Sequence, residues 1–571
     1  MLWQVARSTR IPRGLLRHRP TNRLFDDIVR NGVLATPQKQ SLSTIPSHAN
    51  PFARQPGAQN GTPVKEEKTG GSTSTHGRKV IDGLVRSIRK QKRVAFASIA
   101  DGTTLAPLQA VFSDPKLTEN ISNGAFVSLQ GNWVPSQGGG QQENELQVEK
   151  VLMIGDGDTV ENPIQKKAMT TGFLRTVPHL RMRTDFQSLL LRVRSMLVSS
   201  MQTHFSETQN SDRPIYLVHP PLITSSDCEG AGEVFTLSPK STKPAPSDSN
   251  EGVTKNELYF RDPKYLTVSS QLHLEAFCAQ LGAVYAFSPT FRAEESDTPR
   301  HLAEFYMLEA EYRNMDLKQI MHGVKSLVQE MTTALMNHHV GRELVKYYAD
   351  KNRKAPADEI VDPSGRWTQL LGEWRTIEYT AAVSLLEEAN SAKGGKLFTR
   401  RPVWEHGLQL EHERWLSEHF ADNRPVFVTD YPKVVKPFYM LPSGLSTEDN
   451  SAERPSESKE TVACFDLLLP YGYCEVAGGS LREHRLPNLV CAMREKGLLQ
   501  KVEPGTVEPY PYLEPEESLG SLKWYADLRR FGSSPHGGYG LGFDRLLAYL
   551  TGVANVRDVV AFPRVWGKAD C

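Results

Sequence analysis

Between Tyr265 and Met315 the sequence reads as strand, helix, strand, charged loop and strand. The loop lies in FRAEESDTPRHLAEF, residues 291–305, which holds two arginines, a histidine and four carboxylates between two phenylalanines. A run of mixed charge is usually a solvated surface, but this one joins two strand patterns and therefore predicts a hairpin of a sheet. Further strand patterns near Cys464 and His536 and helical patterns between them predict a mixed, mostly antiparallel sheet with helices packed on it.

Length and charge limit what such a sheet can belong to. The chain has 571 residues and a net charge of +1, so we expect several domains and, for any polyanionic partner, local basic patches rather than a basic coat. The six cysteines form no CxxC pair and lie near no histidine cluster, which indicates reduced thiols without a cysteine metal site or a disulfide framework. No apolar run reaches the roughly 18 residues of a membrane span, so we expect no membrane partner.

The N-terminus has a composition of its own. Residues 1–35 carry arginines at 7, 10, 13, 17, 19 and 23 before the first acid, Asp26, with apolar residues among them. Spaced arginines in an acid-poor segment favour a mitochondrial presequence; an unstructured basic tail and a nuclear or RNA-binding arm are the alternatives. Residues 36–77, rich in Pro, Gly, Ser and Thr, predict a disordered linker.

Residues 78–158 contain about five short strand patterns with a turn at Asp101-Gly102, the size of a small β-barrel such as an OB-fold. Its first part has seven basic side chains against one acid before Phe96. Such a surface could follow a phosphate backbone while Phe96 stacks on an unpaired base; the alternative is that Phe96 belongs to the barrel core. We expect a hinge at 159–175 and a second domain at 176–571.

The residues of the charged loop indicate a particular kind of binding site. A strand ending in Arg292, a loop ending in Arg300-His301 and a return strand carrying Phe305 would place cations along an extended anion, with a ring to cover a flat base. Arg545 follows GGYGLGF, where glycines permit close backbone approach and a helix N-terminus adds its dipole. No GxxxxGK[ST] P-loop is present. These residues indicate a triphosphate clamp.

Three segments, YLVHPPLIT, FRAEESDTPRHLAEF and GYGLGFDR, resemble in order the signature motifs of the class II aminoacyl-tRNA synthetases that charge Asp, Asn and Lys. TVSSQL, DCEGAGEVF, YPKVVKPFYM and EVAGGSLREHR look most similar to the asparaginyl-tRNA synthetases of that subclass. The resemblance runs from about Val80 to Arg564. It implies a five-stranded OB-fold anticodon-binding barrel, then an α+β catalytic domain on an antiparallel sheet flanked by helices, in a homodimer.

The resemblance also implies the reaction: ligation of L-asparagine to tRNA(Asn) through an asparaginyl-adenylate, with ATP and Mg²⁺. The presequence pattern of residues 1–35 predicts that this reaction takes place in the mitochondrial matrix. Arg292 and Arg545 would be catalytic. The residues implied at each subsite are: for ATP, Arg292, Glu294, Arg300, His301, Phe305, Glu475, Gly542 and Arg545; for Mg²⁺, Glu475 and Asp466; for the amino acid, Glu229, Ser269, Gln271, Glu309 and Arg482; for the anticodon, Arg89, Phe96 and Gln109. His301 could instead be an ordinary loop histidine and Asp466 an ordinary strand-end residue.

The segment SSQLHLE, residues 269–275, favours asparagine over aspartate as the substrate. The related aspartate enzymes typically place a lysine three residues after Gln271, where this chain has Leu274. A buried substrate carboxylate without a partner is costly, whereas a neutral amide could lie between Glu309 and Arg482. Glu309 could alternatively bind the substrate's amino group.

Departures from the family pattern are Leu481, where glutamine is usual, and Asp544, where glutamate is common. Polar segments near 341–366 and 442–460 predict surface loops. Three other functions remain as alternatives: an aspartyl-tRNA synthetase, an asparagine synthetase derived from the same catalytic core, and a non-catalytic tRNA-binding paralogue.

Overall fold

The computed structural model describes residues 77–137, 142–155, 157–165, 169–207, 213–225, 233–237, 259–260, 262–350, 363–444 and 460–571. The predicted presequence and nearly all of the predicted linker lie outside these residues, as do Glu229 and Cys228. The five described cysteines are all free. Among the described helices, none combines the length and the apolar character that crossing a bilayer requires.

The N-terminal domain is a closed barrel of five strands in the order β1-β2-β3-β5-β4. The strands are β1 (Gly77–Lys90), β2 (Ala95–Ala100), β3 (Leu108–Phe112), β4 (Phe126–Pro135) and β5 (Asn144–Gly155). β1 pairs with β4 and closes the barrel, and only β3 and β5 run parallel. Alternate residues such as Ala97, Ile99 and Phe112 fill its core, as a two-residue side-chain period requires. The predicted OB-fold is confirmed.

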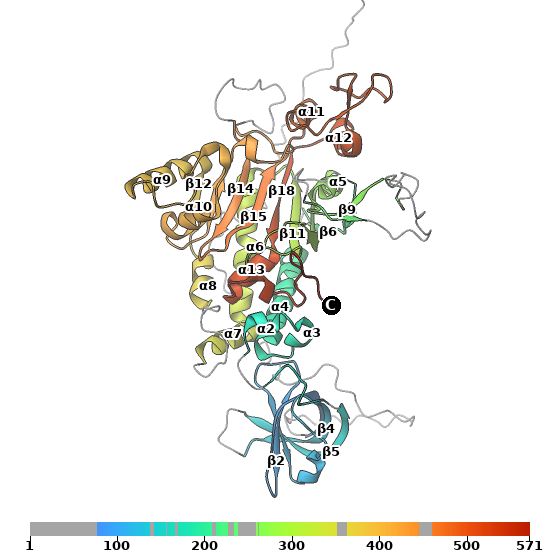
Figure 1. Ribbon diagram of the computed structural model, residues 1–571, viewed down its shortest axis with the longest axis vertical. Helices are drawn as coiled ribbons and strands as arrows, with labels where there is room; N and C mark the ends of the chain where they lie inside the picture. The colour runs from blue at the N-terminus through green and yellow to red at the C-terminus, as the bar shows by residue number, and fades with distance from the viewer. Residues whose placement is uncertain are drawn as a thin grey trace, which may run out of the picture. The chain divides into compact units, whose positions relative to one another are not determined.

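The second domain is built on an eight-stranded sheet (Figure 1). Its strands in spatial order are β12 (Arg375–Glu378), β13 (Val426–Thr429), β14 (Cys464–Leu469), β15 (Cys474–Leu481), β18 (His536–Gly542), β11 (Glu304–Arg313), β10 (Ala283–Phe291) and β6 (Tyr216–Leu217). The six inner strands are antiparallel, as predicted. The two edge strands pair in parallel and make the sheet mixed; at two and four residues they are too short to leave a sequence pattern.

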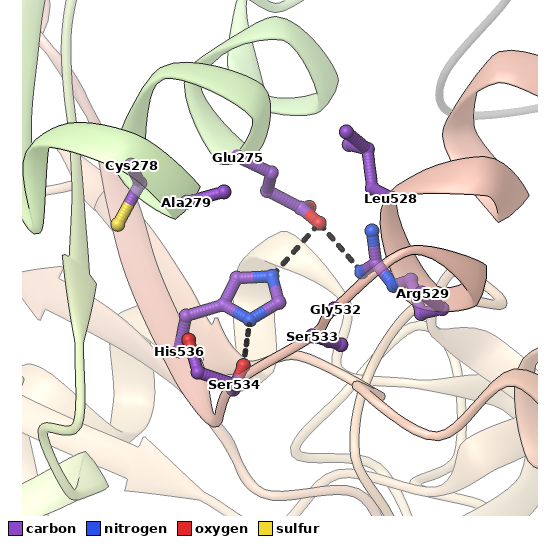
Figure 2. A pocket seen from close by; sticks show the side chains of 9 residues that line it. All are labelled: Glu275, Cys278, Ala279, Leu528, Arg529, Gly532, Ser533, Ser534 and His536. Carbon is purple, nitrogen blue, oxygen red and sulfur yellow. Dashed lines mark hydrogen bonds and ion pairs between the residues drawn. The ribbon is translucent and has the colours of Figure 1, made fainter.

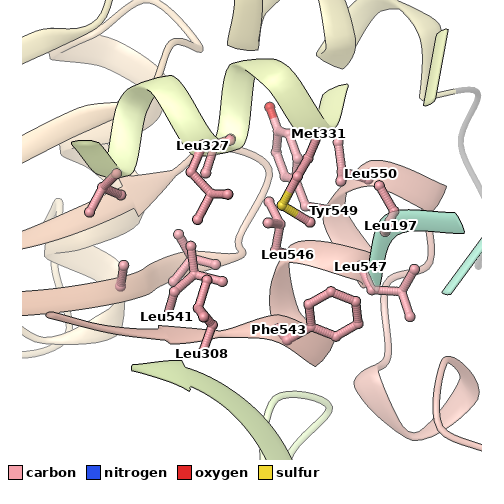
Figure 3. Close-up of a cluster of buried hydrophobic side chains, with 14 of the residues drawn as sticks. Leu197, Leu308, Leu327, Met331, Leu541, Phe543, Leu546, Leu547, Tyr549 and Leu550 are labelled. Carbon is pink, nitrogen blue, oxygen red and sulfur yellow. The ribbon is translucent and has the colours of Figure 1, made fainter. Parts of the chain in front are cut away.

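One face of this sheet carries the main hydrophobic core. The helices that pack there are α4 (Asp185–Glu207), α6 (Leu317–Asn337), α7 (His339–Ala349), α8 (Ser364–Leu371) and α13 (Phe543–Thr551). Figure 3 shows Leu308 and Leu541 of the sheet packed against Leu327 of α6 and Phe543 of α13. Helix α6 begins at a capping box, in which Asp316 accepts from the Gln319 backbone and Gln319 accepts in return.

The opposite face is covered only towards its sides. Near β12 it packs against α9 (Tyr379–Ala392) and α10 (Leu410–Trp415), which lie beside that edge in Figure 1. Beyond β18 a separate apolar cluster joins α5 (Gln271–Leu281), α11 (Leu486–Glu495) and α12 (Lys523–Arg530). The central strands between these clusters carry the candidate site.

Short elements complete the domain. They are the helices α2 (Thr171–Leu174) and α3 (Pro178–Arg181), a small sheet of β7 (Ile223–Thr224), β9 (Lys264–Leu266) and β8 (Thr236–Leu237), and the pair β16 (Gln500–Lys501) and β17 (Glu517–Ser518).

The predicted surface loop at 341–366 is wrong at both of its ends. Residues 341–349 belong to α7 and residues 364–366 to α8. Val340, Leu344 and Tyr348 recur every four residues and are buried in the main core, so a narrow apolar stripe was hidden by the polar composition around it. Residues 351–362, like 445–459 of the second predicted loop, lie outside the described part of the chain.

Candidate active site

A row of four residues crosses the open face of the sheet. Asp466 on β14 is paired with Gly478 on β15, Gly478 with Gly540 on β18, and Gly540 with Glu309 on β11. Cross-strand partners point to the same face, so two carboxylates stand at the ends of a floor whose two middle residues are glycines. The end of the Met307 side chain, from the same face of β11, lies over Gly540, where a Cβ atom would come within 2.6 Å of Met307 Cε.

Cβ atoms at the glycines on this face would come close to their neighbours. A Cβ atom on Gly538, the neighbour of Gly540 on the same face, would lie 2.1 Å from the carbonyl oxygen of Ala310 and from Glu311 Oε2. A Cβ atom on Gly478 would lie 3.2 Å from Asp466 Oδ1 and 3.4 Å from Glu475 Oε1. The carboxylates of Asp466 and Glu475 therefore meet above Gly478.

Glu475 reaches this face because of a β-bulge. The pairing of β14 with β15 shifts by one residue, from Leu467 opposite Ala477 to Leu468 opposite Glu475. The extra residue, Val476, is buried in the main core. Without the bulge, strand alternation would turn Glu475 into the core with Ala477.

Four basic side chains converge at the phosphate end of the site: Arg292, Arg300, His301 and Arg545. The pKa of Arg545 is lowered by burial and by Arg300 and Arg292, against the pull of Glu475. The pKa of His301 is lowered by burial and by the three arginines, against the pull of Glu294. Arg545 and His301 are thus both affected by the positive charge of Arg292 and Arg300, which is the electrostatic signature of a site prepared for a polyanion.

The loop that carries three of these cations is held on both sides. His301 Nδ1 lies 2.6 Å from Thr298 Oγ1, and its Nε2 lies 3.3 Å from Glu294 Oε2. Near the C-terminus, Arg557 pairs with Asp297 at 2.7 Å, and the Ala303 amide donates to the Arg564 carbonyl at 2.7 Å. The hairpin predicted from FRAEESDTPRHLAEF is thus present and anchored.

Arg545 lies in the first turn of α13, three residues after Gly542, which is the N-cap of this helix. Its Nη1 donates to the Glu475 carbonyl at 2.9 Å, which ties the helix to the bulged strand. Asp544 beside it forms an ion pair with Arg194 of α4 and accepts from the Tyr306 amide at 2.8 Å. Asp544, one of the two departures from the family pattern, therefore helps to fix the position of α13. Leu481, the other departure, is buried in the main core.

Phe305 faces the site together with Glu309, because both are odd-numbered residues of β11 whose partners lie on the open face. Its ring is half-buried, and the Arg292 guanidinium lies over it with Cζ 5.7 Å from the ring centroid. A ring and a cation thus share one wall of the site, as a purine with attached phosphates would require.

The carboxylates of Glu475 and Asp466 have an acidic neighbour that the sequence did not suggest. Glu413 of α10 accepts from the Glu475 amide at 3.4 Å. Burial and then the neighbouring Glu475 raise the pKa of Glu413 to about 7, while Arg300 opposes the shift. Asp466 is held by Lys436, whose Nζ lies 2.9 Å and 2.7 Å from its two oxygens. Glu475 and Asp466 are oxygen ligands of the kind that Mg²⁺ takes, although Asp466 would share its charge with Lys436.

At the other end of the row, Glu309 lies against the start of α5. Its Oε1 accepts from Ser269 Oγ at 2.6 Å and from the Ser270 amide at 3.0 Å. Burial raises the pKa of Glu309, and these hydrogen bonds oppose the shift. Leu274 is buried in an apolar cluster with Val218 and Cys278, so it contributes hydrocarbon rather than charge.

Arg482 lies at this end as well, and its partners were not predicted. Its Nε and Nη2 donate to the two oxygens of Glu311 at 3.1 Å and 3.0 Å, and Nη1 donates to Ser480. Glu311, two residues after Glu309 on β11, therefore fixes the plane of the guanidinium. Three of its five N–H groups are used by these bonds, which leaves two for a ligand.

A second unpredicted group lies beside Arg482: Glu275, Glu311 and His536 are close enough to suggest a metal site. Figure 2 shows the Glu275 carboxylate between the His536 ring and the Arg529 guanidinium. Because Arg529 and Arg482 already neutralise these carboxylates, the group is a buried ion-pair network. The sequence does not reveal this network, because its residues lie far apart in the chain.

On the barrel, Phe96 points outward. It is half-exposed on β2 between the buried Ala95 and Ala97, and it pairs with Arg89 of β1. The reading of Phe96 as a core residue is therefore wrong. Gln109 lies on the same outer face, with Nε2 3.0 Å from Glu145 Oε2. Glu145, an unpredicted member of this face, is buried although its strand parity points it outward.

Barrel and site together define a two-domain enzyme that activates a carboxylate with a nucleotide and presents it to a nucleic acid, as the class II aminoacyl-tRNA synthetases do. Residues 173–566 match the family model of the class II tRNA synthetases (D, K and N), and residues 79–154 match that of the OB-fold nucleic acid binding domain. The chain belongs to the class II tRNA synthetases of this D, K and N family.

Individual relatives agree with this family and confirm the resemblance to asparaginyl-tRNA synthetases. The chain is 38% identical over 492 residues to the mitochondrial asparagine–tRNA ligase of Schizosaccharomyces pombe, which covers 86% of this chain and 94% of that protein. It is 37% identical to the asparagine–tRNA ligase of Nostoc sp., with 86% and 96% covered. The crystal structure of asparaginyl-tRNA synthetase from Pyrococcus horikoshii complexed with asparaginyl-adenylate superposes with a TM-score of 0.65 at 27% identity, covering 86% and 95%.

Proposed function

We propose that the protein ligates L-asparagine to tRNA(Asn) through an asparaginyl-adenylate, for translation in mitochondria. The observation that carries the proposal is the glycine floor that connects the cation cluster at Arg292 and Arg545 to the polar pocket at Glu309. One end suits a triphosphate and the other suits an amino acid. Relatives that share 37–38% identity and bear the name asparagine–tRNA ligase support it.

In the first step, a carboxylate oxygen of asparagine attacks the α-phosphorus of ATP and pyrophosphate leaves. Arg292 would bind the α-phosphate and the substrate carboxylate, and Arg300 and His301 would bind the β- and γ-phosphates. Arg545 would approach from the far side, beside Gly542 at the N-terminus of α13. No covalent enzyme intermediate is required, because positioning and charge stabilisation supply the catalysis.

Adenine would lie on the Phe305 ring, and Glu294 would contact the base or the end of the tRNA. Glu475 and Asp466 would hold Mg²⁺, since both carboxylates meet above Gly478. When bound, the ion would neutralise phosphate charge. In the second step the terminal ribose hydroxyl of the tRNA attacks the adenylate carbonyl and AMP leaves.

Selection of asparagine follows from the charges around its pocket. Ser269, Gln271 and Glu309 would contact the amino acid, as would Glu229, which lies outside the described residues. Two free N–H groups of Arg482 match the amide carbonyl and Glu309 matches the amide NH₂, while Leu274 offers no cation for an aspartate carboxylate. Rejection through unpaired or repelled polar groups is the strong form of discrimination.

Pyrophosphate exchange with the purified full-length chain tests the activity, with asparagine and aspartate assayed separately. Exchange that depends on asparagine, followed by charging of tRNA(Asn) and not tRNA(Asp), is the expected outcome. Equal exchange with aspartate would favour the aspartyl enzyme. No exchange with either amino acid, together with retained tRNA binding, would favour a non-catalytic paralogue, which the presence of Arg292, Glu475 and Arg545 argues against.

The mitochondrial location rests on the arginine-spaced, acid-poor residues 1–35 and on mitochondrial relatives from two yeasts. A fluorescent protein fused behind residues 1–40 is expected to enter the matrix. A matched fusion with the arginines at 7, 10, 13 and 17 changed to glutamine is expected to stay outside. Cytosolic retention of the unchanged fusion would contradict this part of the proposal.

A homodimer is supported by the edge strand β6. Tyr216 and Leu217 of this strand are each 40% exposed, and Ile223 nearby is 44% exposed. Exposed apolar side chains on an open sheet edge are typical of a surface that another chain covers. Light scattering is expected to give twice the 63.9 kDa chain mass, and Leu217→Lys is expected to shift the protein towards monomer.

A further inference from the structure

Glu275 is the hub of the buried network beside the amino-acid pocket. Its carboxylate is 1% exposed and accepts from Arg529 at 2.6 Å, from Tyr525 Oη at 2.8 Å and from Gln271 Nε2 at 3.2 Å. His536 Nε2 lies 3.0 Å from the same carboxylate, as Figure 2 shows. These donors come from α5, α12 and β18, so one acid links three elements.

The carboxylate of Glu275 stays ionised in this setting. Burial alone would raise the pKa of Glu275, but Arg529, then His536 and Arg482, hold it well below its ordinary value. An ionised carboxylate has no hydrogen to donate. Every group that touches it must therefore present a donor.

This requirement acts on Gln271, the first residue of α5. A glutamine amide has one donating end and one accepting end that are nearly the same size. Because Glu275 only accepts, the NH₂ end of Gln271 must face it, one helical turn along α5. The carbonyl oxygen Oε1 then faces away from Glu275, and no donor to Oε1 is found in the part of the chain that the structure describes.

Gln271 lies close to Glu309, because Ser269 connects the two residues. Its backbone amide donates to Ser269 Oγ at 3.1 Å, and Ser269 Oγ donates to Glu309. A carbonyl oxygen turned away from Glu275 at this point is an acceptor available to a ligand. Such an acceptor matches one hydrogen of an ammonium group, which has three hydrogens to donate.

We propose that Glu275 is a positioning residue: it holds the Gln271 amide with its carbonyl oxygen towards the pocket, so that the α-ammonium group of the amino acid meets an acceptor. The inference rests on the proposed function, which places the amino acid at Gln271 and Glu309. It assigns to Glu275 a specificity for the α-amino group and no contact with the substrate itself.

The test compares two ligands that differ only in that group. Asparagine and succinamate, which is asparagine without its α-amino group, are measured as ligands by calorimetry in the absence of ATP. Wild-type protein is expected to prefer asparagine. In Glu275→Gln the amide of residue 271 is free to rotate, and the preference is expected to fall on the order of tenfold, the size of losing one hydrogen bond to a charged group.

A purely structural role predicts a different result, because a loosened pocket would weaken both ligands equally and leave their ratio unchanged. Tyr525→Phe is the matched control: it removes one donor from Glu275 but leaves the carboxylate, so the ratio is expected to stay at the wild-type value. An unchanged ratio in folded Glu275→Gln, or an equal fall in Tyr525→Phe, would overturn the inference.

Two further variants keep the inference testable if Glu275→Gln does not fold. Gln271→Met removes the amide and leaves the hub intact, and it is expected to lower the ratio as Glu275→Gln does. The exchange Gln271→Glu with Glu275→Gln restores a donor facing an acceptor, so its ratio is expected to exceed that of Glu275→Gln. A wild-type ratio in Gln271→Met would overturn the inference; failure of the wild-type protein to bind asparagine would instead overturn the proposed function.

Discussion

Glu475 and Arg545 are joined through the main chain: the Arg545 guanidinium donates to the Glu475 carbonyl at 2.9 Å. The arginine of α13 thus holds the bulged segment of β15 whose side chain faces the phosphate end of the site. A change at Arg545 alters both a cation and the strand that presents the acid.

Arg545→Ala is therefore expected to abolish adenylate formation while the protein stays folded. It removes a charge-assisted contact that strengthens as pyrophosphate departs, a loss on the order of 10²-fold or more in the exchange rate. Arg292→Ala is expected to behave alike. Pyrophosphate exchange measures the loss, and thermal melting confirms folding. An exchange rate within a few-fold of wild type would refute the triphosphate clamp.

ATP binding is expected to take up protons at His301. In the free protein the pKa of His301 lies below its ordinary value because of burial and the nearby arginines. A bound triphosphate favours the imidazolium form and raises that pKa, so at a pH between the two values binding adds protons and ATP affinity increases as the pH falls.

Calorimetric titration with ATP, in buffers of different ionisation enthalpy near pH 6, measures this uptake. His301→Gln is the control, because it keeps a polar side chain and cannot titrate. Equal proton uptake by the wild-type protein and His301→Gln would assign the uptake to ATP itself and contradict the prediction.

Phe96→Ala is expected to weaken tRNA charging and to leave adenylate formation unchanged. The ring stands on the outer face of the barrel opposite Arg89, where stacking on a base is worth roughly 1–3 kcal/mol. The KM for tRNA(Asn) in the charging assay measures the effect, with Val111→Ala on the paired position of β3 as the control. A parallel fall in pyrophosphate exchange would mean that Phe96 supports the fold instead.

Glu309→Gln is expected to reduce asparagine activation and to shrink the preference for asparagine over aspartate. The variant keeps the shape of the side chain and removes the charge that would repel a substrate carboxylate, a discrimination of up to about 10⁴-fold in sites of this kind. Exchange rates with the two amino acids give the ratio. If asparagine activation falls but the ratio holds, Glu309 binds the amino group and the side-chain specificity lies elsewhere.

The sequence predicted the parts of this site that follow from local pattern. The short strand patterns of residues 78–158 placed Phe96 on a strand of a barrel, the family resemblance added Gln109, and the charged run between two strands gave the hairpin with Arg292 and Phe305. Three arginines and a histidine were expected around one anion, and the lowered pKa values of His301 and Arg545 agree with that arrangement. The roles of these residues remain predictions that the experiments above test.

What the sequence could not supply depends on contacts between distant segments. Glu413 is 62 residues from the Glu475 amide that it accepts from, and Glu275 is 254 residues from Arg529. The bulge at Val476 leaves no local signal, because Val476 and Ala477 read as an ordinary apolar pair of a strand. The edge strands β6 and β12 are too short for periodicity to appear.

The alternation along β11 has a consequence for inherited variation. Phe305 and Glu309 face the site, while Leu308 and Ala310 between and beyond them belong to the core. An in-frame loss of one codon within this strand would turn every later side chain over, so that Glu309 would enter the apolar layer and Leu308 would occupy the pocket. Such a deletion changes no reading frame, yet we expect it to be as damaging as truncation, whereas conservative point substitutions in the same strand are tolerated more readily.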